Sequence, residues 1–337
     1  MINNGDLQKA VELINKSTNI LLTTHTRPDG DAIGCMAALI EVLMALGKKT
    51  NPVLLSPLPQ WYDFLLEKKL PVLGYDLTPE QLKALLAESD LLVILDTNCY
   101  SQLPDLDKFL TQNEKPVLVI DHHITTDGLG DIELIDTAAA ATAQIVLQLL
   151  NCARWPITEK IADCLFLAIA TDTGWFQFGN TDSRALRTCA DLMDAGADAL
   201  GIRQRIYENF SPERFRLMVT MLSRLQLHFD GRFAVQYLLN KDFDETGAQR
   251  PDTENLIDEC RRIKSVEAAA LFVEQPDGRF KVSLRSTGPV DVREIAQKFG
   301  GGGHKQATGT YLPGPLENAV RLIRTEVERQ FEYLPNK

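Results

Sequence analysis

The chain has 337 residues, more than a single hydrophobic core usually serves, so two domains are expected. Hydrophobic residues make up 45% and charged residues 24%, an ordinary globular composition that gives no reason to expect disorder. The net charge of −11 argues against tight, nonspecific binding of duplex DNA. The amino terminus lacks a secretory signal pattern, and no apolar run nears the roughly 18 residues that span a bilayer. We therefore expect a cytoplasmic protein with no membrane partner.

Apolar runs alternate with amphipathic segments over the first 200 residues, as they do in βαβ units. Strands are predicted at 20–24, 52–55, 91–95 and 116–120, and helices at 32–46, 62–69, 79–88, 139–150, 159–170 and 181–195. The uninterrupted apolar runs at 91–95 and 116–120 are typical of strands buried on both faces of a parallel sheet. The pattern predicts a doubly wound, mainly parallel α/β domain over 1–200, followed by a helical linker over 201–224.

The pattern changes after residue 225. Asp230-Gly231 between alternating runs predicts one hairpin, and Asp277-Gly278 predicts a second. Helices are predicted at 253–262, 292–299 and 316–331. Residues 225–337 should therefore form a smaller mixed α+β domain, and we expect the active site in the cleft between the two domains.

Residues typical of metal sites follow three predicted strands and one helix. They are His25, Asp29 and Asp31 after the first strand, Asp96 after the third, Asp121, His122 and His123 after the fourth, and Asp172 after the helix at 159–170. Ligands of an open α/β sheet bind at the carboxyl ends of its strands, so these side chains should meet at one edge. Crowded, buried carboxylates need cations to stay ionised. Carboxylates with a few imidazoles suit Mn²⁺ or Mg²⁺ better than structural zinc, and two ions about 3.5–4 Å apart would fit.

Each string also has an ordinary structural interpretation. The segment around Asp29 and Asp31 is a good turn sequence, Asp96 could cap a helix, and a histidine pair is often a surface feature. Independent structural uses would not place all of these strings at strand ends. Their convergence therefore favours the metal site.

These residues carry a resemblance to a known family. The sequence resembles the DHH phosphoesterases, which are named for the string found here at 121–123. The segment 25–34 resembles the first motif of that family, Asp96 its second and Asp172 its fourth. The glycines at 301–303 resemble the glycine-histidine signature of the DHH-associated C-terminal domain, although Thr308 stands where many members have alanine.

The resemblance implies two Mn²⁺ ions as cofactors, with Mg²⁺ or Co²⁺ as substitutes. The implied ligands are His25, Asp29 and Asp96 for one ion, and Asp31, Asp96, His122 and Asp172 for the other. Asp96 would bridge the ions and take part in catalysis. Asp121 would orient a histidine, a role that metal sites commonly require, and His123 would face the scissile phosphate.

The resemblance also implies the substrates. Compact two-domain members with this signature hydrolyse short oligoribonucleotides and remove phosphate from 3′-phosphoadenosine-5′-phosphate, by hydroxide attack on phosphorus at a metal pair. The expected partner is thus a short single-stranded RNA or a nucleotide bisphosphate, and a homodimer is expected by analogy alone. The residues predicted to bind substrate are Arg285, Gly301, Gly302, Gly303, His304 and Lys305. Glycines let a backbone approach phosphate, and Arg285 could bind it bidentately. The alternatives are a flexible loop and a surface ion pair.

Other functions stay open at this point. Hydrolysis of linear or cyclic dinucleotides and single-strand exonuclease action use the same motifs. A manganese pyrophosphatase shares the metal residues, but it would not be expected to carry the segment at 301–304. A nucleotide-binding regulator with a vestigial site is the alternative from a different class, and the intact set of acidic ligands argues against it.

Overall fold

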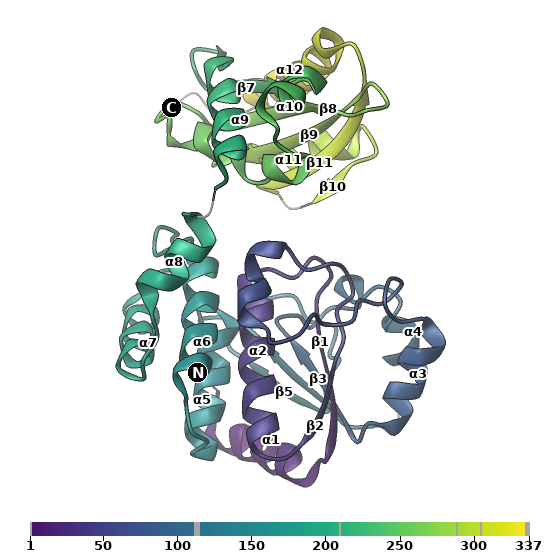
Figure 1. Ribbon diagram of the computed structural model, residues 1–337, viewed down its shortest axis with the longest axis vertical. Coiled ribbons are helices and arrows are strands. Elements are labelled where there is room, and N and C mark those ends of the chain that lie inside the picture. Colours follow the sequence, from purple (N-terminus) through teal and green to yellow (C-terminus); the bar gives the residue numbers. More distant parts are fainter. Residues whose placement is uncertain (1, 111–114, 209, 288, 304, 334–337) are drawn as a thin grey trace. The chain divides into compact units, whose positions relative to one another are not determined.

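The computed structural model describes residues 2–110, 115–208, 210–287, 289–303 and 305–333 (Figure 1). The chain divides into two compact units, Met1–Asn209 and Phe210–Lys337. Of the two helices observed in the region predicted as a linker, α8 (Ala199–Tyr207) belongs to the first unit and α9 (Pro212–Ser223) to the second.

The first unit is built on a five-stranded parallel sheet with the strand order β2-β1-β3-β4-β5. Its strands are β1 (Asn19–Thr24), β2 (Lys49–Pro52), β3 (Leu91–Leu95), β4 (Val117–Asp121) and β5 (Ile132–Ile135). The strand order reverses between β1 and β3, so the crevice that binds ligands in doubly wound sheets lies beyond the carboxyl ends of these two strands.

Helices cover both faces of this sheet (Figure 1). The helices of the first unit besides α8 are α1 (Asn4–Lys16), α2 (Gly30–Ala45), α3 (Pro79–Glu88), α4 (Asp107–Leu110), α5 (Thr142–Ala153), α6 (Glu159–Asp172) and α7 (Ser183–Asp194). In β1, Ile20 and Leu22 pack with α2, α5 and α6, whereas Leu21 packs with α3 on the opposite face. Alternate side chains of a strand point to opposite faces, so a continuous apolar run is required here.

Helices α2 and α6 pack closely at Gly34. A Cβ atom at this position would lie 2.5 Å from the backbone oxygen of Cys164, so a larger residue would push the helices apart. Because α2 carries Asp31 and α6 ends at Asp172, this contact helps to set the distance between two of the predicted site residues.

Three predictions for the first unit need correction. The second strand lies at Lys49–Pro52 rather than at 52–55, because it is a polar edge strand without an apolar run, and Leu54 forms only an isolated bridge. The segment predicted as a helix at 62–69 is a 3₁₀ helix, Gln60–Leu65. Helix α5 begins at Thr142 rather than at residue 139. Strand β5 and helix α4 had no clear sequence signal.

The second unit contains a six-stranded sheet in the order β10-β11-β9-β8-β7-β6. Its strands are β6 (Gln226–His228), β7 (Phe233–Leu238), β8 (Ala268–Glu274), β9 (Arg279–Ser286), β10 (Gly302–Gly303) and β11 (Ala307–Pro313). The antiparallel pairs β6–β7 and β8–β9 confirm both predicted hairpins, and the parallel pair β7–β8 makes the sheet mixed. The predicted α/β fold with a second, mixed domain is therefore confirmed.

Helices α10 (Asn240–Thr246), α11 (Val292–Gln297) and α12 (Leu316–Tyr333) complete the second unit with α9. The segment predicted as a helix at 253–262 instead forms two 3₁₀ helices, Arg250–Thr253 and Leu256–Arg262. The left-handed backbone at Asn255, within the predicted range, explains why no α-helix continues through this segment.

The second unit also holds a buried ion pair. The carboxylate of Asp242 is fully buried and accepts hydrogen bonds from Arg224, with Nη2 at 2.6 Å, and from the backbone N–H of Leu239 at 2.6 Å. Burial alone would raise the pKa of Asp242, but these hydrogen bonds outweigh it and hold the pKa below its usual value.

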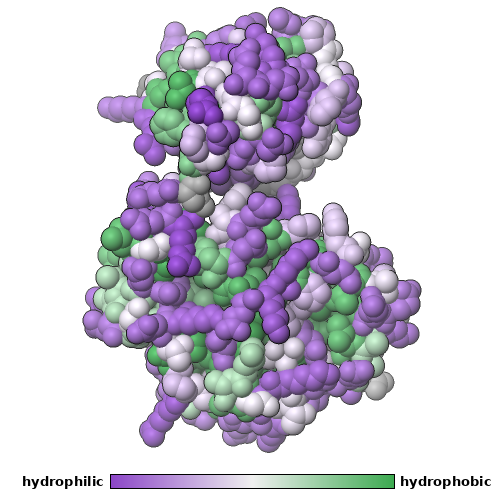
Figure 2. All heavy atoms as spheres, in the orientation of Figure 1, coloured by the Kyte–Doolittle hydropathy of each residue, from purple (hydrophilic) through white to green (hydrophobic). Residues whose placement is uncertain are grey.

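On the face drawn in Figure 2, hydrophilic residues predominate, with smaller hydrophobic areas between them on the first unit. Among the residues that the structure describes, no helix is long and apolar enough to cross a bilayer.

Candidate metal and phosphoester site

The predicted site residues of the first unit gather at the carboxyl edge of its sheet. His25 directly follows β1, and its Nε2 lies 3.4 Å from Asp96 Oδ2 and 3.9 Å from Asp29 Oδ1. Asp29 caps α2, accepting the N–H groups of Asp31 and Ala32 at 3.0 and 3.1 Å. The cap holds Asp29 in place although its side chain is more than half exposed.

Asp96 lies at the centre of the site, close to all three of its histidines. It follows β3 with a left-handed backbone (φ 59°), an unfavourable conformation for a residue with a Cβ atom. Its N–H donates to Ile120 O of β4 at 2.8 Å, which fixes the turn against the neighbouring strand. The side chain is buried at 2% exposure, within 4 Å of a nitrogen of each of three histidines.

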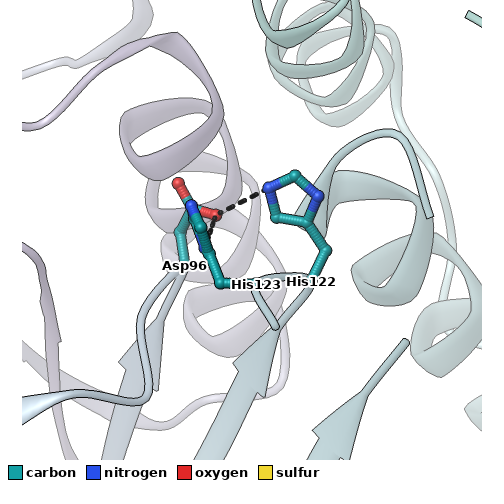
Figure 3. A group of neighbouring side chains, drawn as sticks. All are labelled: Asp96, His122 and His123. Atoms are coloured by element: carbon teal, nitrogen blue, oxygen red, sulfur yellow. Dashed lines mark ion pairs between the residues drawn. The ribbon is translucent and has the colours of Figure 1, made fainter. Parts of the chain in front are cut away.

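His122 extends the site toward α2 and α6. Its Nδ1 lies 3.1 Å from Ala139 O, so this nitrogen carries the proton and Nε2 is left free to bind a cation. Nε2 lies 3.6 Å from Asp172 Oδ2, 3.7 Å from Asp96 Oδ1 and 3.9 Å from Asp31 Oδ2. Figure 3 shows His122 and His123, which follow β4, and a ring nitrogen of each lies within 4 Å of Asp96 Oδ1.

Asp121 and His123 form a separate pair beside this group. Asp121 is the last residue of β4 and is fully buried. Its Oδ1 accepts the N–H of His123 at 3.1 Å and lies 2.7 Å from His123 Nδ1. The hydrogen bond to Asp121 raises the pKa of His123. The carboxylate thus orients a half-exposed imidazole and favours its protonated form.

The other acids of the site are short of positive charge. Burial raises the pKa of Asp31, and it raises the pKa of Asp172 to about 8. The pKa of Asp96 is raised by burial and by the neighbouring charge of Asp31. Among the described residues, the ion-pair partners of these three acids are histidines. Carboxylates crowded in this way need a cation in order to ionise together.

The donor atoms fit such a cation. Within the described residues, three groups have ligand atoms that all lie within 4.8 Å of one another: His25, Asp29 and Asp96; Asp31, His122 and Asp172; and Asp96, His122 and His123. Oxygen donors with a few imidazoles suit Mn²⁺ or Mg²⁺. Asp96 and His122 each belong to two groups, so these groups are parts of one site that could hold metal.

The predicted substrate-binding residues lie in the second unit. Arg285 of β9 forms an ion pair with Asp258 at 3.4 Å, the structural alternative considered from the sequence. Gly302 and Gly303 form β10 and pair with Gly309 and Thr308 of β11, so this run is a short strand rather than a free loop. The N–H of Gly301 donates to Ala296 O, and Lys305 is exposed. His304 lies outside the described residues.

Sequence reasoning missed two residues that hold the site together. Ala139 O orients His122, and Thr142 contacts both Asp31 and Asp96. The alanine-rich segment around them looks like part of a helix. The one local signal for a role of this segment is Ala141. It stands immediately before the helix, where a residue with a capping side chain is usual, so the helix needs an acceptor from elsewhere.

Comparisons with known proteins identify both units. Residues 19–169 match the N-terminal domain of the DHH family, and residues 230–332 match the DHHA1 domain. A relative from Thermus thermophilus, named bifunctional oligoribonuclease and PAP phosphatase NrnA, is 32% identical over 315 residues, which cover 92% of this chain and 90% of the relative.

The fold is shared by solved structures of other proteins. An exopolyphosphatase-related protein from Bacteroides fragilis superposes with a TM-score of 0.88 at 24% identity, covering 98% of this chain and 97% of that one. RecJ from Thermus thermophilus, in complex with Mn²⁺, gives a TM-score of 0.54 at 16% identity and covers 98% of this chain and 55% of RecJ.

The fold and these matches define a hydrolase that acts on phosphoester bonds. More particularly, the chain belongs to the DHH family of phosphoesterases and carries its DHHA1 domain.

Proposed function

We propose that the protein is a Mn²⁺-dependent phosphoesterase that hydrolyses short oligoribonucleotides to mononucleotides and dephosphorylates 3′-phosphoadenosine-5′-phosphate to AMP. The observation that carries the chemistry is the group of aspartates and histidines at the edge of the sheet, whose ligand atoms converge around the buried Asp96. The substrate class is supported by the name of the Thermus thermophilus relative, which matches nearly the whole chain.

The metal ligands are proposed as two sets that share Asp96. His25 and Asp29 would hold one Mn²⁺ with it, and Asp31, His122 and Asp172 the other. The clustering of these donor atoms supports both sets, and the Mn²⁺ in the RecJ structure supports the choice of metal, which Mg²⁺ or Co²⁺ could replace. When bound, such ions activate water and offset the charge of the phosphate.

The protein's own groups are proposed to orient the phosphate and move the proton. Asp121 holds His123 through Nδ1, so the other ring nitrogen, Nε2, is available toward substrate. A protonated His123 could donate from Nε2 to the departing oxygen, because Asp121 favours the imidazolium form.

Leaving-group dependence tests this role of His123. His123→Ala should slow hydrolysis of a dinucleotide, whose leaving alcohol needs a proton, by about 10²–10⁴-fold, the usual contribution of a general acid. An activated aryl ester, whose leaving group needs no proton, should be hydrolysed at close to the wild-type rate. An equal effect on both substrates would contradict the assignment.

In the second unit we propose that Arg285, Lys305 and the glycine strand bind a terminal phosphate of the substrate, with His304. Arg285 forms its ion pair with Asp258 through Nε, and its guanidinium retains further N–H donors. Gly302 and Gly303 allow a ligand to approach the backbone because they carry no side chain.

A substrate panel tests the proposal as a whole. The metal-stripped protein is reconstituted with Mn²⁺ and assayed for mononucleotide release from a dinucleotide, for phosphate release from 3′-phosphoadenosine-5′-phosphate, and for action on a long single strand. We expect hydrolysis of the first two, dependence on added metal, and little action on the long strand. Inactivity on both short substrates would overturn the proposal, and preference for the long strand would favour an exonuclease.

The proposal includes a homodimer acting in the cytoplasm and no binding of duplex DNA. The net charge of −11 supports the last point, because duplex binding is dominated by contacts with phosphates. Light scattering of the purified protein gives the oligomeric state. A duplex added to the dinucleotide assay should not inhibit it, and strong inhibition would contradict this part of the proposal.

A further inference from the structure

Helix α5 begins next to a residue that cannot cap it. Its N-cap is Ala141, which has no side-chain acceptor for the first free N–H groups of the helix. The acceptor comes instead from Asp31 of α2. Asp31 Oδ2 accepts the N–H of Thr142 at 2.6 Å, and Asp31 Oδ1 accepts the N–H of Ala143 at 3.1 Å. A carboxylate of the candidate metal site therefore caps α5, and its two oxygens are both fixed.

Thr142 also contacts the central carboxylate of the site. Its hydroxyl donates to Asp96 Oδ1 at 2.7 Å, and its side chain is fully buried. The same residue thus holds Asp31 through its backbone and Asp96 through its side chain. Since Oδ1 of Asp96 is bound in this way, the rotation of the carboxylate is set and Oδ2 is directed toward His25, at 3.4 Å.

We infer that Thr142 is a positioning residue, which fixes the separation and orientation of the carboxylates of Asp31 and Asp96. This role rests on the proposed function, in which both acids hold divalent ions, and adds a residue that would contact neither ion nor substrate. A carboxylate with fixed hydrogen-bond partners keeps its oxygens in place for the ion. Such outer partners typically contribute roughly 10–100-fold to metal affinity.

The two contacts of Thr142 can be removed in two steps. Thr142→Val keeps the shape and the backbone N–H but removes the hydroxyl that binds Asp96, whereas Thr142→Ser keeps both contacts. Thr142→Pro removes the hydroxyl and the N–H together, at the first helical position, where proline is well tolerated. The inference predicts that Mn²⁺ affinity falls in the order Ser, Val, Pro.

The experiment measures Mn²⁺ binding to the metal-stripped full chain through the electron paramagnetic resonance signal of free Mn²⁺, which does not depend on turnover. We expect Thr142→Ser to bind within about twofold of the wild type and Thr142→Val to bind about tenfold or more weakly. The matched control is Thr246→Val, at a buried threonine of the second unit whose hydroxyl donates to Asp242 O at 2.7 Å. This control should lose stability without losing Mn²⁺ affinity.

Wild-type Mn²⁺ affinity in Thr142→Val would overturn the inference while leaving the proposed function intact. If Thr142→Val does not fold, Thr142→Ala carries the same test, because alanine favours a helix. A wild-type chain that binds no Mn²⁺ and hydrolyses neither short substrate would overturn the proposed function itself. The two failures are therefore distinguishable.

Discussion

Buried carboxylates are compensated in one unit of the molecule and left uncompensated in the other. In the second unit, Arg224 binds both oxygens of Asp242, and the pKa of this acid stays below its usual value. In the first unit, Asp31 and Asp96 are equally buried, but their ion-pair partners among the described residues are histidines, and burial raises their pKa. Uncompensated buried charge costs stability and is concentrated at functional sites. We propose that the acid paired with arginine serves the fold, and that the acids whose ion-pair partners are histidines serve the chemistry.

The largest effect should come from Asp96→Asn, which keeps the shape of the side chain and removes its charge. A catalytic metal supplies several kcal/mol of transition-state stabilisation, so kcat/KM for a dinucleotide should fall on the order of a thousandfold. The metal-free variant should melt at a higher temperature than the wild type at neutral pH, because it no longer buries a carboxyl group whose pKa is raised in the folded state, which costs stability above its ordinary pKa. Kinetics with Mn²⁺ and thermal unfolding with a chelator measure the two effects. Retained turnover with Mn²⁺, or a melting temperature of the metal-free variant below that of the metal-free wild type, would contradict the proposed difference between the two units.

For Asp242, the acid paired with arginine, we expect a loss of stability without a loss of activity. Arg224→Met leaves Asp242 buried without a counter-charge, which typically costs about 3–5 kcal/mol of unfolding free energy. We expect the lower end of this range, because the Arg224 side chain is partly exposed. Kcat should be unchanged at temperatures where the variant is folded. Urea unfolding and dinucleotide kinetics measure both quantities, and an unchanged urea midpoint would show that the pair contributes no stability.

The ion pair between Arg224 and Asp242 also predicts that the free energy of unfolding depends on pH. The pKa of Asp242 is lower in the folded state than its ordinary value of 3.8, so its stabilising contribution is complete above this value and is lost as the pH falls through the lower folded pKa. The double variant Arg224→Met, Asp242→Leu lacks the titrating group. As the pH falls below 3.8, the wild type should lose urea resistance faster than the double variant. Parallel curves for the two proteins would contradict the assignment.

Three strands of the first unit, β1, β3 and β4, could be predicted because their side chains are buried on both faces of the sheet. The segment 91–95 needs an apolar side chain at every position and therefore stands out in the sequence, whereas β2 is a polar edge strand and was misplaced. The meeting of His25, Asp96 and His122 follows from the rule that strand ends share one edge of a sheet. That rule predicts that these residues lie close together, but it predicts neither the distances between their atoms nor their roles.

Contacts that join distant segments could not be predicted. No local pattern tells that Asp31 caps α5, because its partner Thr142 lies 111 residues further along the chain. The acceptor for His122, the backbone oxygen of Ala139, could not be predicted either, because it also depends on where α5 begins. Helix propensity extended the predicted helix to residue 139, whereas the observed helix begins later and leaves the oxygen of Ala139 free to accept. The roles of the predicted substrate residues, and the domain boundaries, stay predictions.

The smallest expected effect concerns the glycines of the second unit. Gly303 has a φ of 150°, and a Cβ atom there would lie 2.7 Å from Ala307 O, whereas a Cβ at Gly302 would meet no atom within 4 Å. Gly303→Ala should therefore distort β10 at a cost of about 1–2 kcal/mol, and KM for 3′-phosphoadenosine-5′-phosphate should rise with kcat little changed. Gly302→Ala is the matched control. Equal KM values for the two variants would remove the support for a substrate contact at this strand.

Anomalous diffraction from crystals grown with Mn²⁺ tests most directly whether the uncompensated acids exist to hold metal. The account predicts two Mn²⁺ peaks on either side of Asp96, one bounded by His25 and Asp29 and the other by Asp31, His122 and Asp172. Crystals of Asp96→Asn grown in the same way should show both peaks weakened or lost. Mn²⁺ bound elsewhere, with no peak beside Asp96 in the wild type, would contradict the account.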